Sequence, residues 1–565
     1  MPGHVIVCGM GAVGYRIVEL LHRLGEEVVV ITERALDERR RIAETFGVRV
    51  ILGDARNDRL LREAGLESAK ALIATTNLDL VNLEVALDAA RIRPELPVVI
   101  RLFDQELARQ LETSLEIRRA LGMYALAAPS FTAAALGESV IASLTFQDVP
   151  YVVGRQFVAD GPLARCPTVA AAARRFQLLS LVRERPGGEH AALPAGDEPL
   201  QPGDRLSLLG RKEDWDALFS PSEAPLPALR KPSLRQRLSR SLQRGLTVWR
   251  EEPLTLRVLV LGLCLLIPAI VLLFHFYFRL TLPDALFFTI ITLHGEIGLT
   301  DTGPGIKMYE ILLMVLGSIT LATIYSLITD YLVSSRLRKL LGGKPMPRSG
   351  HVVVIGMGNI GFRVVSELAA LGVPAVAVDA APDGPFLATV RTQAPLVLGD
   401  ARLDDTLQRA GLAQARSVVA ATGDDSINLG IGIAAKRMNP KIRSVVRLFD
   451  AEFARKVENA LGIDAALSSS RIAAPTFVAA ALFSDVAKAF IVGDRLVVLT
   501  ARKAGPEWAG RTPSALRQEH GVQVLVRNGK LGPSEETPLA AGEEVLVGLW
   551  RKVAPSWSEQ GEAGG

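Results

Sequence analysis

Cysteine is scarce in this chain, which has three cysteines among 565 residues. Cys8, Cys166 and Cys264 lie far apart and show no metal-ligand spacing. This scarcity excludes a disulfide-stapled scaffold and a cysteine-ligated metal centre, so we assign no metal. The three thiols are interpreted as packing residues in a reducing compartment.

A secretory signal is also missing, because a strand-like segment begins at His4 and runs directly into a glycine-rich loop. We therefore expect the first domain in the cytoplasm.

The length of the chain predicts three or more domains. The net charge of +4 says little, because the basic residues are clustered. The mean hydropathy of +0.26 is higher than is usual for a soluble protein of this charge content.

Two hydrophobic runs carry no formal charge, residues 258–278 with 21 residues and residues 311–329 with 19. At about 1.5 Å rise per residue, the first spans about 30 Å, the thickness of a hydrocarbon core. The alternative is a pair of buried helices in a large soluble protein, and the flanking charges argue against it. Seven basic residues and no acid lie between positions 225 and 250, and five more basic residues lie between 336 and 348. The positive-inside rule therefore predicts both termini in the cytoplasm.

The basic segment before the first run has leucines at every fourth position within residues 233–250. This pattern fits either a basic amphipathic helix on the inner leaflet or a solvated linker.

A glycine-rich loop of the form G-x-G-x-x-G occurs twice, each time after a strand-like segment and before a helical one. Each loop is followed by a second strand that ends in an acid, 19 or 18 residues past the last glycine. The glycines allow a pyrophosphate to approach the helix N-terminus, and the acid can accept hydrogen bonds from ribose hydroxyls while disfavouring a 2′-phosphate. The candidate residues are Gly9, Gly11, Gly14 and Glu33 in the first copy and Gly356, Gly358, Gly361 and Asp379 in the second.

The two copies continue in register, at an offset of 347 residues at the glycines and of 346 residues from Glu33 onward, so a whole domain has been duplicated. Three further pairs of candidate binding residues share this offset: Asp54 with Asp400, Thr76 with Thr422, and Arg101 with Arg447. Each pair has two interpretations. The aspartates either hold a turn or contact a ligand, the threonines either cap helices or bind, and the arginines either contact phosphate or form a subunit salt bridge. Any single glycine can also serve the tight turn alone.

Each copy alternates strands and helices, which predicts a doubly wound α/β lobe. An apolar helical stretch follows each lobe, at residues 129–146 and 475–490. We expect both stretches to pack against a partner copy, since neither suits a free surface. A smaller β-rich region then follows, at residues 151–210 and 491–550.

The glycine loops, the repeated Gly-Asp-Ala triplets, the Ala-Thr-Thr-Asn and Ala-Thr-Gly-Asp turns and the Arg-Leu-Phe-Asp segments resemble those of RCK domains, also called TrkA-type domains. The resemblance covers about residues 3–214 and 349–552. It implies two Rossmann-like α/β RCK domains, each with a small α+β C-lobe, on either side of an all-α two-helix transmembrane unit with a re-entrant pore helix. The expected boundaries are 1–147 and 148–214 for the first N-lobe and C-lobe, 215–254 for a basic linker, 255–335 for the pore, 336–348 for a second linker, and 349–489 and 490–555 for the second RCK domain.

Residues 255–335 look like the pore of two-transmembrane potassium channels, with a pore-helix start at residues 283–289 and a hinge at Gly317. The usual filter sequence is absent, because Thr300 replaces the second filter glycine and Glu296 replaces the threonine. A β-branched Thr300 resists positive φ, and a ring of Glu296 would concentrate cations, unless that carboxylate is structural. His294 is either a partner of Glu296 or a vestibule residue. The residues assigned to the pore and filter are Thr292, His294, Glu296, Ile297, Gly298, Leu299, Thr300 and Asp301.

The resemblance implies a ligand-gated cation channel, potassium-channel-like, in a bacterial inner membrane, with both RCK domains in the cytoplasm. It also implies a homotetramer surrounded by lipid, gated by NAD(H), ATP, ADP or AMP and, in some members, by Ca²⁺, and passing a monovalent cation. No nucleic-acid partner is expected. One RCK copy precedes the pore, whereas tandem copies usually both follow it.

Two other functions compete with the channel. A non-conducting membrane-anchored nucleotide sensor would suit the abnormal filter. An NAD-dependent oxidoreductase is disfavoured, because the seven histidines show no acid or base pairing near either glycine loop. We therefore expect no enzyme.

Overall fold

The computed structural model describes residues 3–33, 37–103, 118–137, 140–158, 162–211, 213–215, 267–277, 279–294 and 344–557, with isolated residues at 108 and 110 and between 308 and 325. The chain divides into two compact units, Met1–Pro221 together with Lys344–Gly565, and Ser222–Gly343. The first unit contains both copies of the repeat, and each unit is described by itself.

The first copy is a parallel six-stranded sheet in the order β3-β2-β1-β4-β5-β6. Helices cover both faces, so the whole of β1 is buried and its sequence is continuously apolar. Val5 and Val7 face one helical layer, and Ile6 and Cys8 face the other. The elements are β1 (Val5–Cys8), α1 (Ala12–Arg23), β2 (Val28–Thr32), α2 (Asp37–Thr45), β3 (Arg49–Leu52), α3 (Asp58–Glu63), β4 (Ala71–Ala74), α4 (Asp79–Ile92), β5 (Val98–Arg101) and β6 (Arg119–Leu121).

The second copy repeats this arrangement, with the parallel order β14-β13-β12-β15-β16-β17. Two Rossmann-like α/β lobes, as predicted from the glycine loops, are therefore confirmed. The elements are β12 (Val352–Ile355), α13 (Asn359–Ala370), β13 (Ala375–Asp379), α14 (Leu387–Gln393), β14 (Leu396–Leu398), α15 (Asp404–Arg409), β15 (Ser417–Ala420), α16 (Asp425–Met438), β16 (Arg443–Arg447), α17 (Ala451–Leu461) and β17 (Ala465–Leu467), with a 3-10 turn at Leu412–Gln414.

A small antiparallel five-stranded sheet follows each lobe, in the orders β10-β9-β11-β8-β7 and β18-β19-β22-β20-β21. The inner faces of the two small sheets share one apolar cluster. The first contains β7 (Val140–Phe146), β8 (Val149–Phe157), a 3-10 turn (Pro162–Arg165), α7 (Val169–Phe176), β9 (Leu179–Glu184), β10 (His190–Ala192) and β11 (Arg205–Arg211). The second contains β18 (Val486–Val492), β19 (Arg495–Lys503), α19 (Pro513–His520), β20 (Gln523–Arg527), β21 (Lys530–Leu531) and β22 (Glu544–Lys552).

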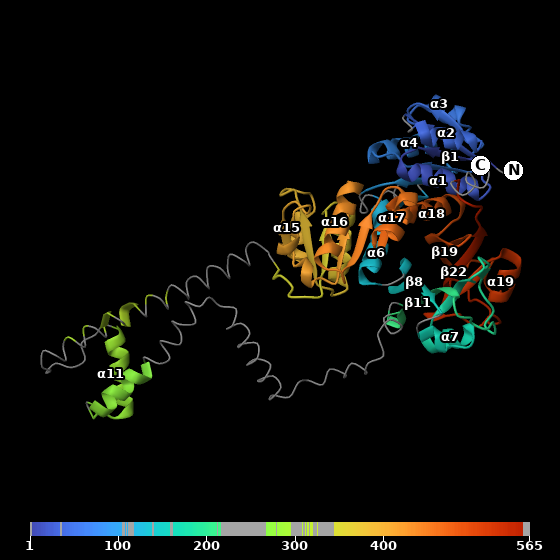
Figure 1. The fold of residues 1–565 in the computed structure, drawn as a ribbon. Helices are drawn as coiled ribbons and strands as arrows, with labels where there is room; N and C mark the ends of the chain where they lie inside the picture. Colours follow the sequence, from blue (N-terminus) through green and yellow to red (C-terminus); the bar gives the residue numbers. More distant parts are fainter. Residues whose placement is uncertain are drawn as a thin grey trace. The chain divides into compact units, whose positions relative to one another are not determined.

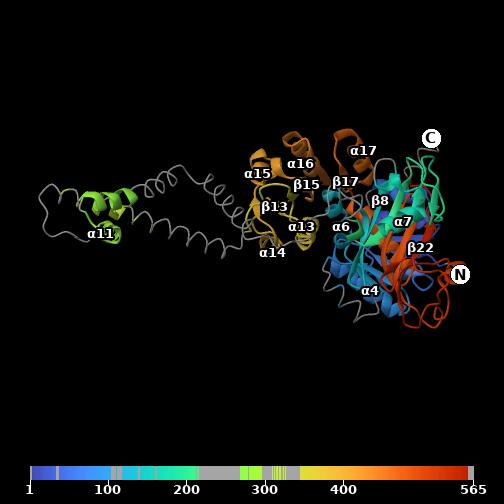
Figure 2. The same cartoon turned by 90° about the horizontal axis from the view of Figure 1, so that it is seen from below.

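The apolar helices after the two lobes are exchanged between the copies. Helix α6 (Met123–Leu136) packs against α13 of the second copy, and α18 (Ser469–Leu482) packs against α1 of the first. Phe131 joins the core around Val352, and Phe477 joins the core around Val5. Figure 1 shows the cyan α6 beside the orange elements of the second copy, and Figure 2 shows it next to α13. The expected partner copy is therefore the other half of the same chain.

Both helices also begin and end earlier than the stretches expected at residues 129–146 and 475–490. Residues 140–146 form strand β7, and residues 486–490 belong to β18. The sequence pattern was misleading because the buried strands are as apolar as the helices that precede them.

A buried polar cluster lies where α6 meets the second copy. The Thr132 hydroxyl donates to the Glu367 carboxylate at 2.6 Å, and the Lys488 ammonium donates to the Leu126 carbonyl at 2.9 Å. Burial raises the pKa of Glu367 to about 7 and lowers the pKa of Lys488 to about 8, while the attraction between the two side chains opposes both shifts. The cluster therefore ties α6, α13 and β18 together.

The end of the chain also crosses between the copies. Trp557 is 3% exposed and stacks on Phe46 at 5.1 Å between ring centroids. Its indole donates to His22 Nδ1 at 3.1 Å, and the Arg23 side chain donates to the Ala554 carbonyl at 2.6 Å. The segment that follows β22 thus fastens the second copy to α1 of the first.

In the second unit, the helix predicted from residue 283 is confirmed as α11 (Leu282–His294), drawn in green in Figure 2. Ile270 and Phe274, from a helical segment at residues 267–277, pack against Ala285. None of the helices within the described residues combines the length and apolar character needed to cross a membrane. Of the expected span at 258–278, residues 267–277 are described, while the span at 311–329 and the linker at 215–254 lie mostly outside the described residues.

The exchange predicts which copy each buried phenylalanine stabilises. Phe477→Ala should lower the free energy of unfolding by about 3–5 kcal/mol, because it removes a fully buried ring from the first copy's core. Hydrogen exchange should then speed up in β1 and α1. Phe131→Ala is the matched variant and should speed exchange in β12 and α13. If each variant instead speeds hydrogen exchange only in the copy that contains the altered helix, the swap of helices between the copies would be contradicted.

Candidate functional site

The glycine loop of each copy lies at the carboxyl end of its first strand, where open α/β sheets bind ligands. Gly9 and Gly356 have φ of +99° and +87°, a left-handed conformation that favours glycine. A Cβ on Gly14 would overlap the Gly9 carbonyl oxygen, and a Cβ on Gly361 would overlap that of Gly356. These four glycines are therefore required by the turn and by the close approach of the helix.

The middle glycines have a different environment. Gly11 and Gly358 are the N-cap residues of α1 and α13, and neither has a side-chain capping hydrogen bond. A Cβ placed on either one would meet nothing within 4 Å. The helix N-terminus therefore opens onto free space, and its amide groups favour an anion there.

In the first copy this space is a cavity of about 300 Å³ at the edge of the sheet. Its lining includes Gly11, Glu33, Asp54, Thr76 and Asn77. Five residues predicted to bind nucleotide, namely Gly9 and the first four of these, are thus brought to one opening, with an exposed carboxylate from Glu33 directly after β2. The cavity has the chemistry for a phosphate at the helix and a ribose at the acid.

The acid of the second copy lies closer to its loop. The Asp379 carboxylate accepts hydrogen bonds from the Met357 and Ala381 amides. Asp379 is the last residue of β13, and Glu33 is the first residue after the equivalent strand β2. The aspartate side chain is one methylene shorter than the glutamate side chain. The two acids therefore occupy equivalent positions at the carboxyl edges of the two sheets but have different surroundings: Asp379 bonds to backbone amides, whereas Glu33 is exposed at the cavity.

Asp54 and Asp400 hold turns, which is one of their two predicted roles. Asp54 accepts hydrogen bonds from the Arg56 amide at 2.9 Å and from its guanidinium at 2.7 Å. Asp400 binds Arg402 in the same way. The side-chain hydrogen bond from the arginine lowers the pKa of each carboxyl group, so both are ionised at neutral pH. Asp54 also reaches the cavity lining.

Thr76 and Thr422 are held by two asparagines that sequence reasoning missed. Asn82 is fully buried, and its Oδ1 accepts from the Thr76 amide and hydroxyl, both at 2.8 Å. Its Nδ2 donates to the Arg101 carbonyl at 3.0 Å. Asn428 makes the same bonds in the second copy. The two asparagines share the 346-residue offset, and that signal could have identified them.

Arg101 and Arg447 end their strands in buried positions, 5% and 7% exposed. Arg101 donates to the Asn77 side chain at 3.2 Å, and Arg447 donates to the Thr422 carbonyl at 3.3 Å. Burial lowers the pKa of both guanidiniums. Each arginine therefore supports the loop beside its glycine turn, and its contact with phosphate or with another subunit stays a prediction.

Most of the residues assigned to the pore lie outside the residues that the structure describes. Thr292 and His294 belong to α11, but their side chains lie outside the described residues, as do Glu296, Ile297, Gly298, Leu299, Thr300 and Asp301. Gly317 lies in a short helical segment at residues 317–319. The roles assigned to these residues stay predictions.

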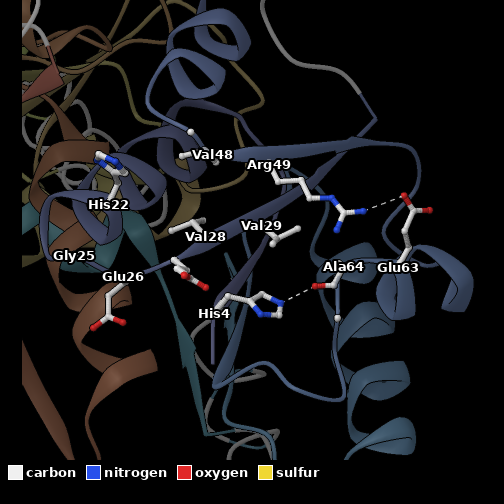
Figure 3. A pocket seen from close by; sticks show the side chains of 13 residues that line it. His4, His22, Gly25, Glu26, Val28, Val29, Val48, Arg49, Glu63 and Ala64 are labelled. Atoms are coloured by element: carbon white, nitrogen blue, oxygen red, sulfur yellow. Dashed lines mark hydrogen bonds and ion pairs between the residues drawn. The ribbon is translucent and has the colours of Figure 1, made fainter. Parts of the chain in front are cut away.

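A larger opening of about 570 Å³ lies at the opposite, amino-terminal edge of the first sheet (Figure 3). Figure 3 shows two pairs of polar groups around it: His4 bonds to the Ala64 carbonyl at 2.6 Å, and Arg49 bonds to Glu63 at 3.5 Å. Glu26, which also lines the opening, pairs with Lys70. Because ligands of open α/β sheets bind at the carboxyl edge, the smaller cavity is the better candidate for a ligand site. Within the described residues, no cluster of His, Cys, Asp and Glu could hold a metal ion.

Comparison with known proteins agrees with this geometry. The TrkA-N domain family matches residues 5–121 and 352–469, which are the two parallel lobes. The Trk system potassium uptake protein TrkA of Mycobacterium tuberculosis is 28% identical over 200 residues, 34% of this chain and 90% of that protein. Potassium channel protein 1 of Methanocaldococcus jannaschii is 28% identical over 115 residues, 20% of this chain and 34% of that protein. Both lobes of the chain therefore match the TrkA-N domain family.

The same fold occurs in a solved channel structure. The structure of the GsuK channel aligns with 100% of this chain and 79% of its own, at a TM-score of 0.53 and 16% identity. A structure of the GsuK channel bound to NAD gives a TM-score of 0.51. Identity at this level shows the fold alone. The chain spans 30% of an uncharacterised protein of Methanothermus fervidus that it also matches.

The loop geometry predicts opposite outcomes for neighbouring glycines. Gly14→Ala should lower the free energy of unfolding by about 3 kcal/mol or more, because its Cβ would overlap the Gly9 carbonyl. Gly11→Ala should change it by less than about 0.5 kcal/mol, since its Cβ enters open space. Chemical unfolding measures both, and equal losses would refute this assignment of the two glycines.

Proposed function

We propose that the chain is one subunit of a ligand-gated cation channel whose two RCK domains bind an adenine nucleotide and act on the pore. The observation that carries this proposal is the pair of glycine loops, each with an open middle glycine at a helix N-terminus. The binding of NAD by the GsuK channel, which has the same fold, supports it. So do the potassium transport names of the relatives.

NAD or NADH is the favoured ligand, with ATP, ADP or AMP as alternatives. The pyrophosphate would lie against the N-terminus of α1 or α13, and the ribose hydroxyls would bond to Glu33 or Asp379. Those carboxylates would repel a 2′-phosphate. Ca²⁺ remains an expectation of the family resemblance alone, and we propose no enzymatic role.

The pore would consist of residues 258–278 and 311–329 as spans, with α11 as the re-entrant helix between them. Four chains would surround one pore in the cell membrane and supply eight RCK domains to a cytoplasmic ring. Expansion of that ring would pull on residues 336–348 and bend the inner helix near Gly317.

A non-conducting nucleotide sensor is the second candidate. It is favoured by one specific observation, the replacement of a filter glycine by Thr300 and of the filter threonine by Glu296. Such a protein would keep the ring and the membrane anchor and would regulate a separate cation transporter.

Nucleotide binding is tested by titrating NAD into the purified full chain in a calorimeter. We expect binding that is abolished when Gly11→Asp and Gly358→Asp are combined, because each carboxylate would meet the phosphate. The thermal unfolding of the double variant should match that of the unaltered protein, since both positions face open space. An absence of heat with NAD, NADH, ATP, ADP and AMP would refute nucleotide binding.

Conduction is tested by flux into liposomes with and without NAD. We expect nucleotide-dependent cation flux with weak preference for K⁺ over Na⁺, because Thr300 resists the filter conformation and Glu296 adds charge. Glu296→Gln should reduce the flux, and the reversal potential of the variant's current under K⁺/Na⁺ gradients should shift.

Mass measurement in detergent should give a homotetramer. A stable monomer or dimer, or a tetramer without current under any nucleotide, would favour the sensor.

A further inference from the structure

The orientation of the buried Asn82 amide is fixed by its hydrogen-bond partners. Its Oδ1 lies 2.8 Å from the Thr76 amide nitrogen, which can only donate. Its Nδ2 lies 3.1 Å from the Thr76 carbonyl and 3.0 Å from the Arg101 carbonyl, which can only accept. The side-chain oxygen therefore faces the Thr76 amide, and the side-chain nitrogen faces the two carbonyls. Asn428 is held in the same way beside Thr422 in the second copy.

This orientation decides what the threonine hydroxyl can offer to a ligand. Thr76 Oγ1 lies 2.8 Å from Asn82 Oδ1 and 3.2 Å from the Leu78 carbonyl, and both of these oxygens only accept. A hydroxyl has a single hydrogen, so that hydrogen is committed to the protein. Thr76 Oγ1 accepts from the Leu78 amide at 3.4 Å and keeps a second lone pair. Toward a ligand, this hydroxyl is therefore an acceptor, and so is that of Thr422, which lies 2.7 Å from Asn428 Oδ1.

The neighbouring donors at the end of β4 are also committed to the protein. The Thr75 amide donates to the Cys8 carbonyl at 2.8 Å, and the Thr75 hydroxyl lies 3.3 Å from the carbonyls of both Cys8 and Gly9. A phosphate oxygen can only accept, so it finds no donor on Thr75 or Thr76. The place for a phosphate is therefore the N-terminus of α1, where Gly11 leaves open space.

The sheet order places the threonine and the acid on opposite sides of the glycine loop. Strand β1, which leads into the loop, lies between β2 and β4. Glu33 follows β2 and Thr76 lies beyond β4, and both line the same cavity. The two strands are two strand spacings apart, about 10 Å. A ligand with its phosphate on the loop and one ribose at Glu33 therefore meets Thr76 with the group beyond its phosphates.

Adenine nucleotides differ in the group that they carry there. In ADP and ATP that end of the molecule is phosphate, whose oxygens accept, whereas in NAD it is a second ribose, whose hydroxyls can donate. We propose that Thr76 and Thr422, positioned by Asn82 and Asn428, accept a hydrogen bond from the second ribose of a dinucleotide and so select NAD over ADP and ATP. This inference rests on the proposed nucleotide binding.

The test is calorimetric titration of NAD, ADP-ribose and ADP into the purified full chain in detergent. ADP-ribose keeps the second ribose and lacks the nicotinamide, so it separates a ribose contact from a contact with the base. We expect NAD and ADP-ribose to bind roughly fivefold or more tightly than ADP. The double variant Thr76→Val with Thr422→Val keeps the shape of both side chains and removes the acceptor. It should weaken NAD and ADP-ribose by roughly fivefold and leave ADP within about twofold of its original affinity.

The double variant Thr76→Ser with Thr422→Ser keeps both hydroxyls and is the matched control, which should retain the preference for NAD. Thermal unfolding identifies a variant that has lost its fold, and the comparison of ADP-ribose with ADP on the intact protein does not depend on any variant. Equal affinities in that comparison would overturn the inference. So would a valine variant that loses ADP binding by the same factor as NAD binding, or one that binds NAD and ADP-ribose unchanged. If none of the three ligands binds to any form, the proposed function fails as well.

Discussion

The exchange of two helices between the halves of the chain is the constraint on which the rest of the structure depends. Each parallel sheet needs apolar cover on both faces, because its strands are buried throughout. One of those faces is completed by a helix from the other half, α18 over the first sheet and α6 over the second. Neither lobe therefore has a complete core without the other, and the two glycine loops belong to one folded body.

This mutual dependence also explains why polar contacts gather along the exchanged helices. Glu367 and Lys488 are buried where α6 meets the second copy, and the Thr132 hydroxyl and the Leu126 carbonyl of α6 satisfy them. A buried charge that lost its partners would cost several kcal/mol, so the pair specifies which surface α6 can occupy. The first copy has Leu20 and Ala142 at the corresponding places, and it is held instead by Trp557 and the residues around it.

The two glycine-loop sites are therefore related by sequence but not identical in environment. Glu33 is exposed at its cavity, whereas Asp379 bonds to its own glycine loop. Leu78 caps α4 without a side-chain bond, whereas Asp424 caps α16 and adds a carboxylate at the second site. The two glycine loops therefore have different polar groups beside them.

The sequence by itself determined the lobes, because its signals are local. The period of the buried strands, the spacing of the glycines and the acids after the second strands each depend on neighbouring residues in the chain, and the 346-residue offset shows that these local signals occur twice. The offset could also have identified Asn82 and Asn428.

Only the tertiary structure decided which sheet each apolar helix covers. Helices α6 and α18 share the pattern Ala-Ala-Pro followed by Phe and a run of alanines, so their sequences suit either sheet equally. The choice depends on where the chain places each helix after its lobe and on contacts such as Thr132 with Glu367, more than 200 positions apart. The contact of Arg447 with the Tyr124 ring has the same origin, since packing between distant segments produces it and no local pattern encodes it.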